Sequence, residues 1–202
     1  AALQPVLKSN VDTTTSTSID TIKSHVAVVG SMIQNGSSAE IIRTLENDLV
    51  KINFTNKGAR PASVELKKYK SADSSDVKLM ASNFNKIAYL INIGNNETAS
   101  TDELYFEAGE VKKEPDGSSS LAFTLRDSSG KSIVHHFSLK PEAYLLDWEL
   151  QTKGADKLFT QNHINLVWQV QADQHELDIQ TEKRETQLGL LNENGYDYFT
   201  MR

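Results

Sequence analysis

The sequence predicts an all-β fold, an antiparallel sandwich, and three observations lead to it. From residue 41 onward, apolar and polar residues alternate with a period of two, as they do in half-buried strands. Clusters of Gly, Asn, Asp and Ser interrupt these runs about every 8 to 12 residues, which is typical of roughly ten or eleven short antiparallel strands. No helical period is sustained beyond residue 40, so a parallel sheet with crossover helices is not favoured.

Residues 1–40 are predicted to be a polar leader or linker. The stretches 9–20 and 34–40 are rich in Ser, Thr, Asn and Gly and have few apolar side chains to bury. Between them, TIKSHVAVVGSMI (21–33) could form a strand or a short helix, and the sequence leaves both open. Its apolar run is about half of the roughly eighteen residues that a membrane helix needs, so no membrane span is predicted.

The first predicted hairpin is ENDLVKINFTNKGARPASVELKKY (46–69). Alternation places Val50, Ile52 and Phe54 on one face of its first strand, and Val64 and Leu66 resume the pattern after the turn. Asn56 and Gly58 tolerate a positive φ, so TNKGARP (55–61) is expected to reverse the chain.

Further strands are predicted at 87–93, 103–106 and 121–127, each bounded by a turn cluster. The run 121–127 continues through the loop DSSG (127–130) into IVHHFSL (133–139), which makes the clearest hairpin of the chain.

Two later runs carry the tryptophans. The first, 144–150, places Tyr144, Leu146, Trp148 and Leu150 on one face, and the second, 164–170, does the same with Ile164, Leu166, Trp168 and Val170. Both tryptophans are therefore expected in the core.

The histidines do not predict a metal site. His135 and His136 are adjacent in a strand, so their side chains should point to opposite faces, one half-buried and one solvated. His163 and His175, with Glu176 and Asp178 nearby, lack a recognised ligand spacing.

No catalytic constellation is predicted either. Asp147 and Glu149 share a strand face, but it is the face opposite Trp148, and a solvated face explains them. The chain contains no G-x-S-x-G, phosphate-loop or dinucleotide motif. The basic patch ELKKYK (65–70) is read as an edge strand whose lysines discourage pairing with another chain.

Composition excludes some function classes. The net charge is -6, with 21 basic residues scattered among 27 acidic ones, whereas a nucleic-acid surface needs clustered Lys and Arg, so no nucleic-acid partner is predicted. The absence of cysteine excludes disulfides and thiolate chemistry.

A family resemblance rests on TLENDLVKINFTNKGARPASVELKKYKS (44–71). It resembles the opening of the periplasmic domain of the YidC/Oxa/Alb family of membrane protein insertases, in which a Leu/Ile-Glu-Asn-Asp/Glu start, a Thr/Ser-Asn-x-Gly-Gly/Ala turn and a Ser-Val-x-Leu-Lys-x-Tyr strand follow one another. The matching positions are Glu46, Asn47, Asn56, Gly58, Ser63, Val64, Leu66, Lys67 and Tyr69. More loosely, 164–172 resembles the family's Leu-x-Trp strand and 182–200 its charged segment before a further strand, so the resemblance covers residues 41–202.

The resemblance implies a β-supersandwich, similar to galactose-mutarotase-like domains, on the periplasmic side of the bacterial inner membrane. It implies a non-catalytic scaffold without catalytic, metal or cofactor-binding residues, because the family's insertase activity belongs to a membrane-embedded region. The implied partners are Sec translocon components such as SecDF and nascent membrane proteins, and residues 1–40 become the tether that follows the first membrane helix.

Two departures from the family pattern stand out. The second glycine of the turn is Ala59, a mild change at negative φ and a strained one at positive φ. The resemblance also implies that the domain continues past Arg202, so that 41–202 lacks its C-terminal part.

Two alternative functions stay open. A carbohydrate-binding or mutarotase-like enzyme would need a histidine, His136 or His163, converging with Glu149 or Glu176. A peptide-binding chaperone module would need an exposed apolar groove or a free strand edge.

Overall fold

The structure, a computed structural model, describes residues 39–80, 82–94, 97–127, 129–171, 173–193 and 195–200. The predicted leader therefore lies almost wholly outside the described residues. Among the latter the strands are β1 (Ile42–Glu46), β2 (Val50–Thr55), β3 (Arg60–Lys70), β4 (Asp76–Met80), β5 (Lys86–Ala88), β6 (Leu90–Gly94), β7 (Glu97–Ser100), β8 (Glu107–Ala108), β9 (Lys112–Lys113), β10 (Ser119–Arg126), β11 (Ser132–Leu139), β12 (Leu146–Lys153), β13 (Val167–Gln169), β14 (Gln187–Asn192) and β15 (Gly195–Thr200). The helices are η1 (Thr101–Glu103), α2 (Ala155–Leu158), η2 (Thr160–Asn162) and α3 (Ile179–Glu185).

The first sheet has the strand order β1-β2-β3-β4, antiparallel throughout. Its β2–β3 pair is the predicted first hairpin, with Val50 opposite Leu66 and Ile52 opposite Val64. Since Val50, Ile52 and Phe54 are all buried, the period-two pattern identified the inward face correctly.

The second sheet has the order β12-β11-β10-β8, with β9 also paired to β10. The β10–β11 hairpin keeps an unbroken register from Ser119 opposite Leu139 to Arg126 opposite Ser132, which confirms the clearest predicted hairpin. At its turn the Asp127 carboxylate accepts hydrogen bonds from the backbone N–H groups of Ser129 and Lys131, each at 2.9 Å.

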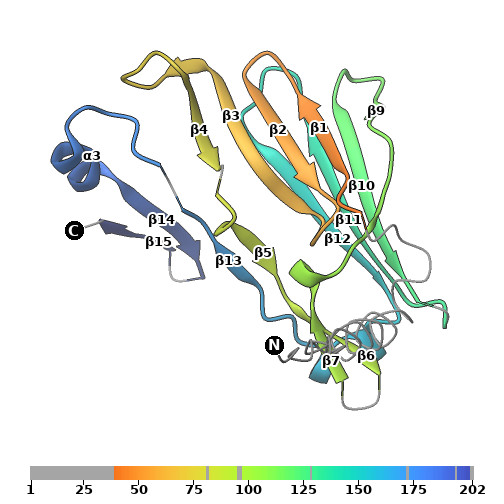
Figure 1. Cartoon of the computed structure of the whole chain (residues 1–202). Helices are drawn as coiled ribbons and strands as arrows, with labels where there is room; N and C mark the ends of the chain where they lie inside the picture. The colour runs from red at the N-terminus through yellow and green to blue at the C-terminus, as the bar shows by residue number, and fades with distance from the viewer. Residues whose placement is uncertain are drawn as a thin grey trace, which may run out of the picture.

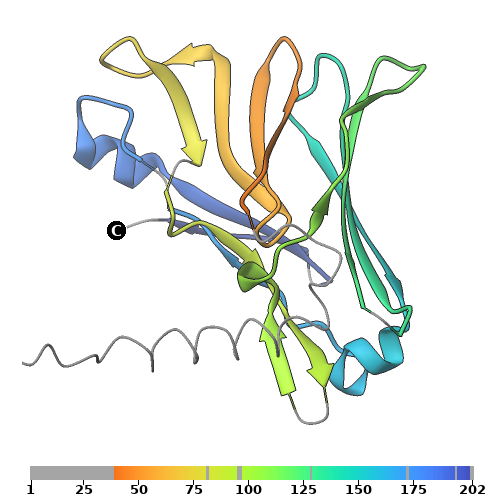
Figure 2. The ribbon, with the colours of Figure 1, turned by 45° about the vertical axis from the view of Figure 1, so that its right-hand side comes forward.

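The core lies between these two sheets, which Figure 1 shows one in front of the other and Figure 2 shows as separate layers. Phe54 of the first sheet contacts Phe137 of the second with ring centroids 4.6 Å apart, and Phe123 completes the cluster. Aromatic pairs across two facing sheets define a sandwich. The prediction of an all-β antiparallel sandwich is confirmed, and the likeness to galactose-mutarotase-like supersandwiches stays a prediction.

Strands β5, β6, β7 and β13, which we call the arm, extend from this sandwich as two-stranded sheets, β13-β5 and β6-β7. The run 87–93 was expected to be one strand, but it divides at Tyr89 between β5 and β6. Tyr89 is 2% exposed, and its backbone pairs with Thr101 instead of a neighbouring strand. The buried Tyr89 therefore separates β5 from β6.

The expected strand at 103–106 is wrong. The turn η1 ends at Glu103, and only an isolated bridge joins Lys57 to Tyr105. Leu104 and Phe106 are nevertheless fully buried, because alternate residues of an irregular extended segment can enter a core as strand residues do.

One tryptophan departs from the core prediction. Trp148 is half-buried and packs against the core, but Trp168 on the short strand β13 is 71% exposed. Alternation correctly placed it on a face, but in the described residues β5 is the only strand paired with β13 and nothing covers that face.

The basic patch also corrects an expectation. Residues 65–70 lie on β3, between β2 and β4, so they are not on an edge strand. Lys67 pairs with Glu46 at 2.8 Å and Lys70 pairs with Asp76 at 2.5 Å. These lysines are used in ion pairs within the sheet.

Ala59 adopts a φ of +49°, next to Gly58 at +77°. The departure from the family's second glycine is therefore the strained case, since an L-residue with a side chain is disfavoured in the left-handed region.

None of the helices among the described residues is long and apolar enough to cross a membrane.

Candidate functional site

His135 lies inside the sandwich, and both of its ring nitrogens are occupied. It points inward from β11 and is 1% exposed. Nδ1 lies 2.8 Å from the carbonyl oxygen of Ala59, and Nε2 lies 2.7 Å from the Tyr89 hydroxyl. Because a carbonyl can only accept, Nδ1 carries the proton and Nε2 accepts from the tyrosine.

The electrostatics of this pair follow from burial. Desolvation lowers the pKa of His135 to about 4, although the Ala59 carbonyl opposes the shift. Burial likewise raises the pKa of the Tyr89 hydroxyl well above its usual value. Both groups are therefore neutral near pH 7, and the arrangement is a satisfied core hydrogen-bond network.

His136 points to the other face, as predicted for two adjacent strand residues. It is half-buried, and His135 is fully buried, so the expectation that one of the two is solvated is wrong. In the β11–β12 register His136 lies directly opposite Glu149, and Ser138 opposite Asp147. Glu149 and Asp147 are exposed on this outward face, away from Trp148.

One pair of the enzyme alternative, His136 and Glu149, is thus adjacent. It lies on an outward sheet face, and none of the described hollows is lined by either residue. The other candidate histidine, His163, is exposed after η2.

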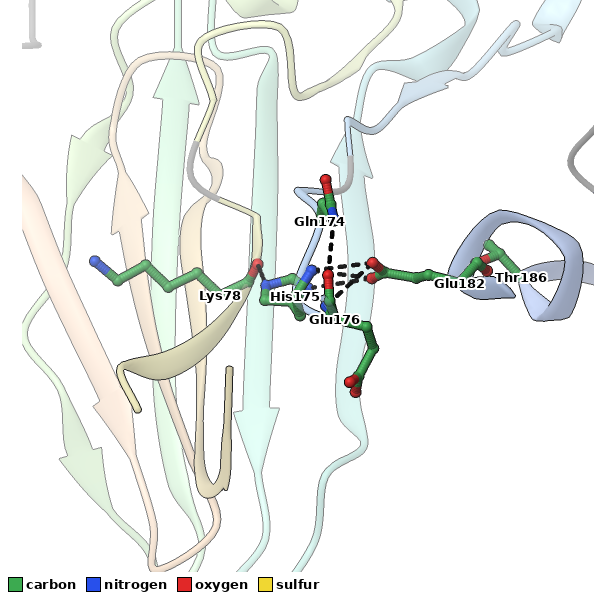
Figure 3. Close-up of polar contacts among 6 residues, drawn as sticks. All are labelled: Lys78, Gln174, His175, Glu176, Glu182 and Thr186. Carbon is green, nitrogen blue, oxygen red and sulfur yellow. Dashed lines mark hydrogen bonds and ion pairs between the residues drawn. The ribbon is translucent and has the colours of Figure 1, made fainter. Parts of the chain in front are cut away.

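The second polar cluster fastens the segment around His175 to the edge of the first sheet (Figure 3). His175 Nε2 lies 3.1 Å from the Lys78 carbonyl of β4, to which it donates, and the His175 carbonyl accepts from the Ala72 N–H at 2.9 Å. Both contacts join residues about a hundred positions apart in the chain, so this segment covers part of the β4 edge.

Glu182 holds that segment from the other side (Figure 3). Its carboxylate oxygens accept from the His175 N–H at 3.0 and 3.2 Å and from the Glu176 N–H at 3.2 Å. Thr186 donates its hydroxyl to the Glu182 carbonyl at 2.6 Å, within the last turn of α3. We call this set of contacts the β4 latch: His175, Glu182, Lys78 and Ala72.

Helix α3 was not predicted from the sequence. Asp178 is its N-cap, with its carboxylate accepting from the N–H groups of Gln180 and Thr181. The Thr181 hydroxyl also donates to this carboxylate. Its hydrogen bond lowers the pKa of Asp178 most, and the bonds from the backbone N–H groups lower it further. An Asp at the N-cap and an acidic residue, Glu182, in the following turn are a helix-start signal that could have revealed α3.

Across the described residues, no group of three or more His, Asp and Glu side chains is placed to hold a metal ion. The Asp178 carboxylate caps helix α3, and the backbone N–H of Glu176 donates to the Glu182 carboxylate.

A polar hollow at the end of the sandwich measures about 440 Å³ and is lined by Glu46, Asn47, Asp48, Lys67, Lys113 and Glu142 among others. Its central side chain is Asn47, whose amide donates to the carbonyls of Lys140 and Ala143 at 2.8 and 2.7 Å and accepts from the N–H groups of Leu49 and Val50. The amide is saturated by backbone groups and ties the β1–β2 turn to the β11–β12 turn.

Large apolar side chains gather on the surface toward the end of the chain. We use the name C-terminal apolar surface for the exposed large apolar side chains of residues 164–170 and of the β14–β15 hairpin, which are Ile164, Leu166, Val167, Trp168, Val170, Leu188, Leu191, Tyr196, Tyr198 and Phe199. The hairpin β14–β15 carries them on both faces, since Leu188 lies opposite Phe199 and Leu191 opposite Tyr196. A two-stranded ribbon with two uncovered apolar faces is marginal in water, so this surface needs a cover.

Comparison with known proteins adds a family. The model of the YidC periplasmic domain matches residues 43–157. These residues include the whole sandwich from Arg43 to β12, and they end before β13 and the C-terminal apolar surface begin. No solved structure matches the chain.

Curated relatives agree with this match. The membrane protein insertase YidC of Phocaeicola vulgatus is 30% identical over 151 residues, which is 74% of this chain and 23% of that protein. That of Bacteroides fragilis is 33% identical over 148 residues, 72% of this chain and 23% of the relative, and that of Azobacteroides pseudotrichonymphae is 26% identical over 168 residues, 80% and 26%. The chain spans about a quarter of the length of these relatives.

Proposed function

This chain belongs to the YidC periplasmic domain family, and from that premise we propose that it is a non-catalytic scaffold domain within a membrane protein insertase. The scaffold would be held at the periplasmic side of the bacterial inner membrane by the membrane-embedded part of the longer protein. Its role in this proposal is to contact the Sec translocon, SecDF among its components, while nascent membrane proteins are handled elsewhere.

One observation carries the proposal. The titratable side chains with the most specific surroundings are bonded to the protein's own backbone: His135 to Ala59, His175 to Lys78, and Asp178 to the start of α3. A catalytic acid or base keeps a lone pair or a proton available for a substrate. Titratable groups that are bonded to the backbone in this way stabilise the fold, which supports a scaffold role.

The enzyme alternative receives less support. A histidine and a carboxylate would have to meet in a hollow where a sugar ring could be enclosed. His136 and Glu149 meet on an outward sheet face instead. The peptide-binding alternative gains the C-terminal apolar surface and the outer edge of β12, which pairs with β11 alone among the described strands.

The test compares the full-length insertase with a version from which residues 41–202 are deleted, in membranes, by crosslinking to translocon components and by an insertion assay. We expect insertion to persist and the translocon crosslinks to vanish. Loss of insertion, with the shortened protein still made and membrane-inserted, would assign substrate handling to this domain and contradict the proposal.

A matched control addresses catalysis. The double variant His136→Gln, Glu149→Gln in the full-length protein removes the adjacent pair and leaves the sandwich core untouched, because both side chains point outward. Insertion and crosslinks should stay at the level of the unmodified protein. A loss as large as that of the deletion would support chemistry at this pair.

A further inference from the structure

His135 joins three parts of the molecule that are far apart in sequence. It belongs to β11 of the second sheet, its Nδ1 partner Ala59 is in the β2–β3 turn of the first sheet, and its Nε2 partner Tyr89 lies in the arm, between β5 and β6. Its ring also lies against aromatic neighbours, with centroids 5.1 Å from Phe106 and 5.3 Å from Trp148. A single imidazole is therefore the junction of two sheets and the arm.

The neutral imidazole fits this junction and the imidazolium does not. With Nδ1 donating to Ala59 and Nε2 accepting from Tyr89, every polar atom of the ring is satisfied. A second proton on Nε2 would turn that nitrogen into a donor facing the hydroxyl hydrogen of Tyr89. The hydroxyl would then have to rotate and give its own hydrogen to another acceptor, yet among the described residues it has no hydrogen-bond partner other than His135.

No neighbouring anion would compensate the added charge. The residues opposite His135 in the flanking strands are Phe123 and Leu150. Among the residues that the structure describes, Tyr89 is the only titratable side chain in contact with the ring. Arg60 follows Ala59 with a half-buried guanidinium that would repel an imidazolium, and Asp102 beyond the turn is already paired with Lys86 at 3.7 Å.

The two partners differ in how firmly they are held. On the His135 side, β11 has eight-residue ladders to both β10 and β12. On the Tyr89 side, β5 has a three-residue ladder to β13, and among the described strands β6 pairs with β7 alone. Weakening of this junction should therefore open the arm and the β2–β3 turn before it opens the second sheet.

We propose that His135 is an acid-sensitive lock: the neutral ring holds the Ala59 turn and Tyr89 on β11, and protonation releases both and loosens the joint between the sandwich and the arm. Because the arm carries β13, the placement of the C-terminal apolar surface relative to the sandwich would respond to pH. The inference does not depend on which partner the domain contacts.

The test is native-state amide exchange, expressed as protection factors, on the 202-residue chain at pH 7 and pH 5. The informative amides are those of Gly58, bonded to the Leu104 carbonyl at 2.8 Å, and of Tyr89, bonded to the Thr101 hydroxyl at 3.1 Å. If opening exposes His135 with an ordinary pKa of 6.5 in place of about 4, their protection should fall about twentyfold between the two pH values. The amide of Phe137 within β11 should exchange only when the second sheet itself opens, so it should stay better protected than those of Gly58 and Tyr89 at both pH values.

Two variants supply the controls. His135→Gln can still donate and accept but cannot be protonated, so the pH dependence at Gly58 and Tyr89 should disappear. His136→Gln changes the neighbouring histidine of the opposite face and should keep the twentyfold effect. Protection at Phe137 equal to that at Gly58, or no pH dependence at Gly58, would overturn the lock.

A measurement on the unmodified chain covers the case in which His135→Gln does not fold. A long-range ¹⁵N–¹H spectrum should show His135 with its proton on Nδ1, and its ring resonances should not titrate above pH 5. A folded-state titration of His135 near pH 6.5, or a proton on Nε2 at pH 7, would overturn the proposal.

Discussion

Ala59 and His135 meet across the sandwich: the Ala59 carbonyl accepts from His135 Nδ1 at 2.8 Å, while Ala59 itself holds a φ of +49°. A strained turn residue therefore supplies the acceptor for a buried histidine. Because the hydrogen bond uses the backbone of Ala59, a change of its side chain should affect the strain and leave the bond in place.

The first prediction tests that strain. Ala59→Gly should raise the free energy of unfolding by up to about 1 kcal/mol, because glycine adopts positive φ without the steric cost that alanine has. The neighbouring change Gly58→Ala should instead lower it by about 2 kcal/mol, since an added Cβ would lie 3.0 Å from the Asp102 Cα at a φ of +77°. Urea unfolding at pH 7 measures both, and a loss of stability in Ala59→Gly would show that the turn is not strained.

The second prediction concerns the Tyr89 hydroxyl. Tyr89→Phe removes the donor to His135 Nε2 and leaves a buried acceptor unsatisfied, which should cost about 1 to 3 kcal/mol of unfolding free energy. Tyr69→Phe, on a side chain that is 53% exposed, is the matched control and should change stability by less than about 0.5 kcal/mol. Equal effects would mean that the buried hydrogen bond contributes nothing specific.

The third prediction is a pH dependence of global stability with a defined sign. The folded-state pKa of His135, about 4, is below the 6.5 of an unfolded histidine, so the unfolded chain binds the proton first. The stability contribution of the neutral ring is complete above pH 6.5 and is lost as the pH falls from about 6.5 to about 4, by about 3 kcal/mol in all.

The readout is the difference between the unmodified chain and His135→Gln in urea unfolding at pH 7 and pH 4.5. Asp127 and Asp178 have lowered pKa values from hydrogen bonds and also lose stability in acid, but they do so equally in both chains. A difference that does not change with pH would contradict the assignment.

The sandwich could be predicted from the sequence because its strands have one buried and one exposed face. Val50, Ile52 and Phe54 reveal their face by a period of two. Trp168 shows the limit of the same rule, since alternation tells which residues share a face and not whether another layer covers it. Tyr89 shows a second limit: a continuous apolar run did not reveal that the Tyr89 backbone pairs with Thr101 and so separates β5 from β6.

The contacts of the candidate site were harder to predict from the sequence, because most of them join residues that are far apart along the chain. His175 and Glu182 are seven residues apart and could be linked by helix capping, but the Lys78 carbonyl lies 97 positions from His175. Backbone acceptors carry no residue-type signal, so a contact of this kind is invisible before the fold is known. The same holds for Ala59 and His135, which are 76 positions apart.

The fourth prediction tests the β4 latch. Glu182→Ala removes the acceptor shared by the His175 and Glu176 N–H groups, so limited proteolysis should cut the segment 173–178 several times faster, while the unfolding midpoint falls by an amount equivalent to about 1 kcal/mol. Glu185→Ala on the same helix, whose carboxylate pairs with the exposed Arg184, is the control and should behave as the unmodified chain. An unchanged cutting rate in Glu182→Ala would show that the segment stays in place without the latch.

The last prediction concerns the C-terminal apolar surface, which β13 and the β14–β15 hairpin expose together. An apolar fluorescent dye should bind the 202-residue chain, and Trp168→Gln should reduce that binding more than Leu145→Gln does, although the two side chains are almost equally exposed at 71% and 72%. The reason is that Leu166 and Val170, which alternate with Trp168 along the chain, are exposed as well, and a dye requires a contiguous patch.

The chain spans about a quarter of the length of its curated relatives, and we expect another part of the full-length insertase to cover this surface. In the full-length insertase the same dye should then bind far less per domain, and Trp168 emission should shift to shorter wavelength as its ring leaves water. Unchanged dye binding and emission would mean that the surface is open in the longer protein, and that result would favour the peptide-binding alternative over the closed scaffold.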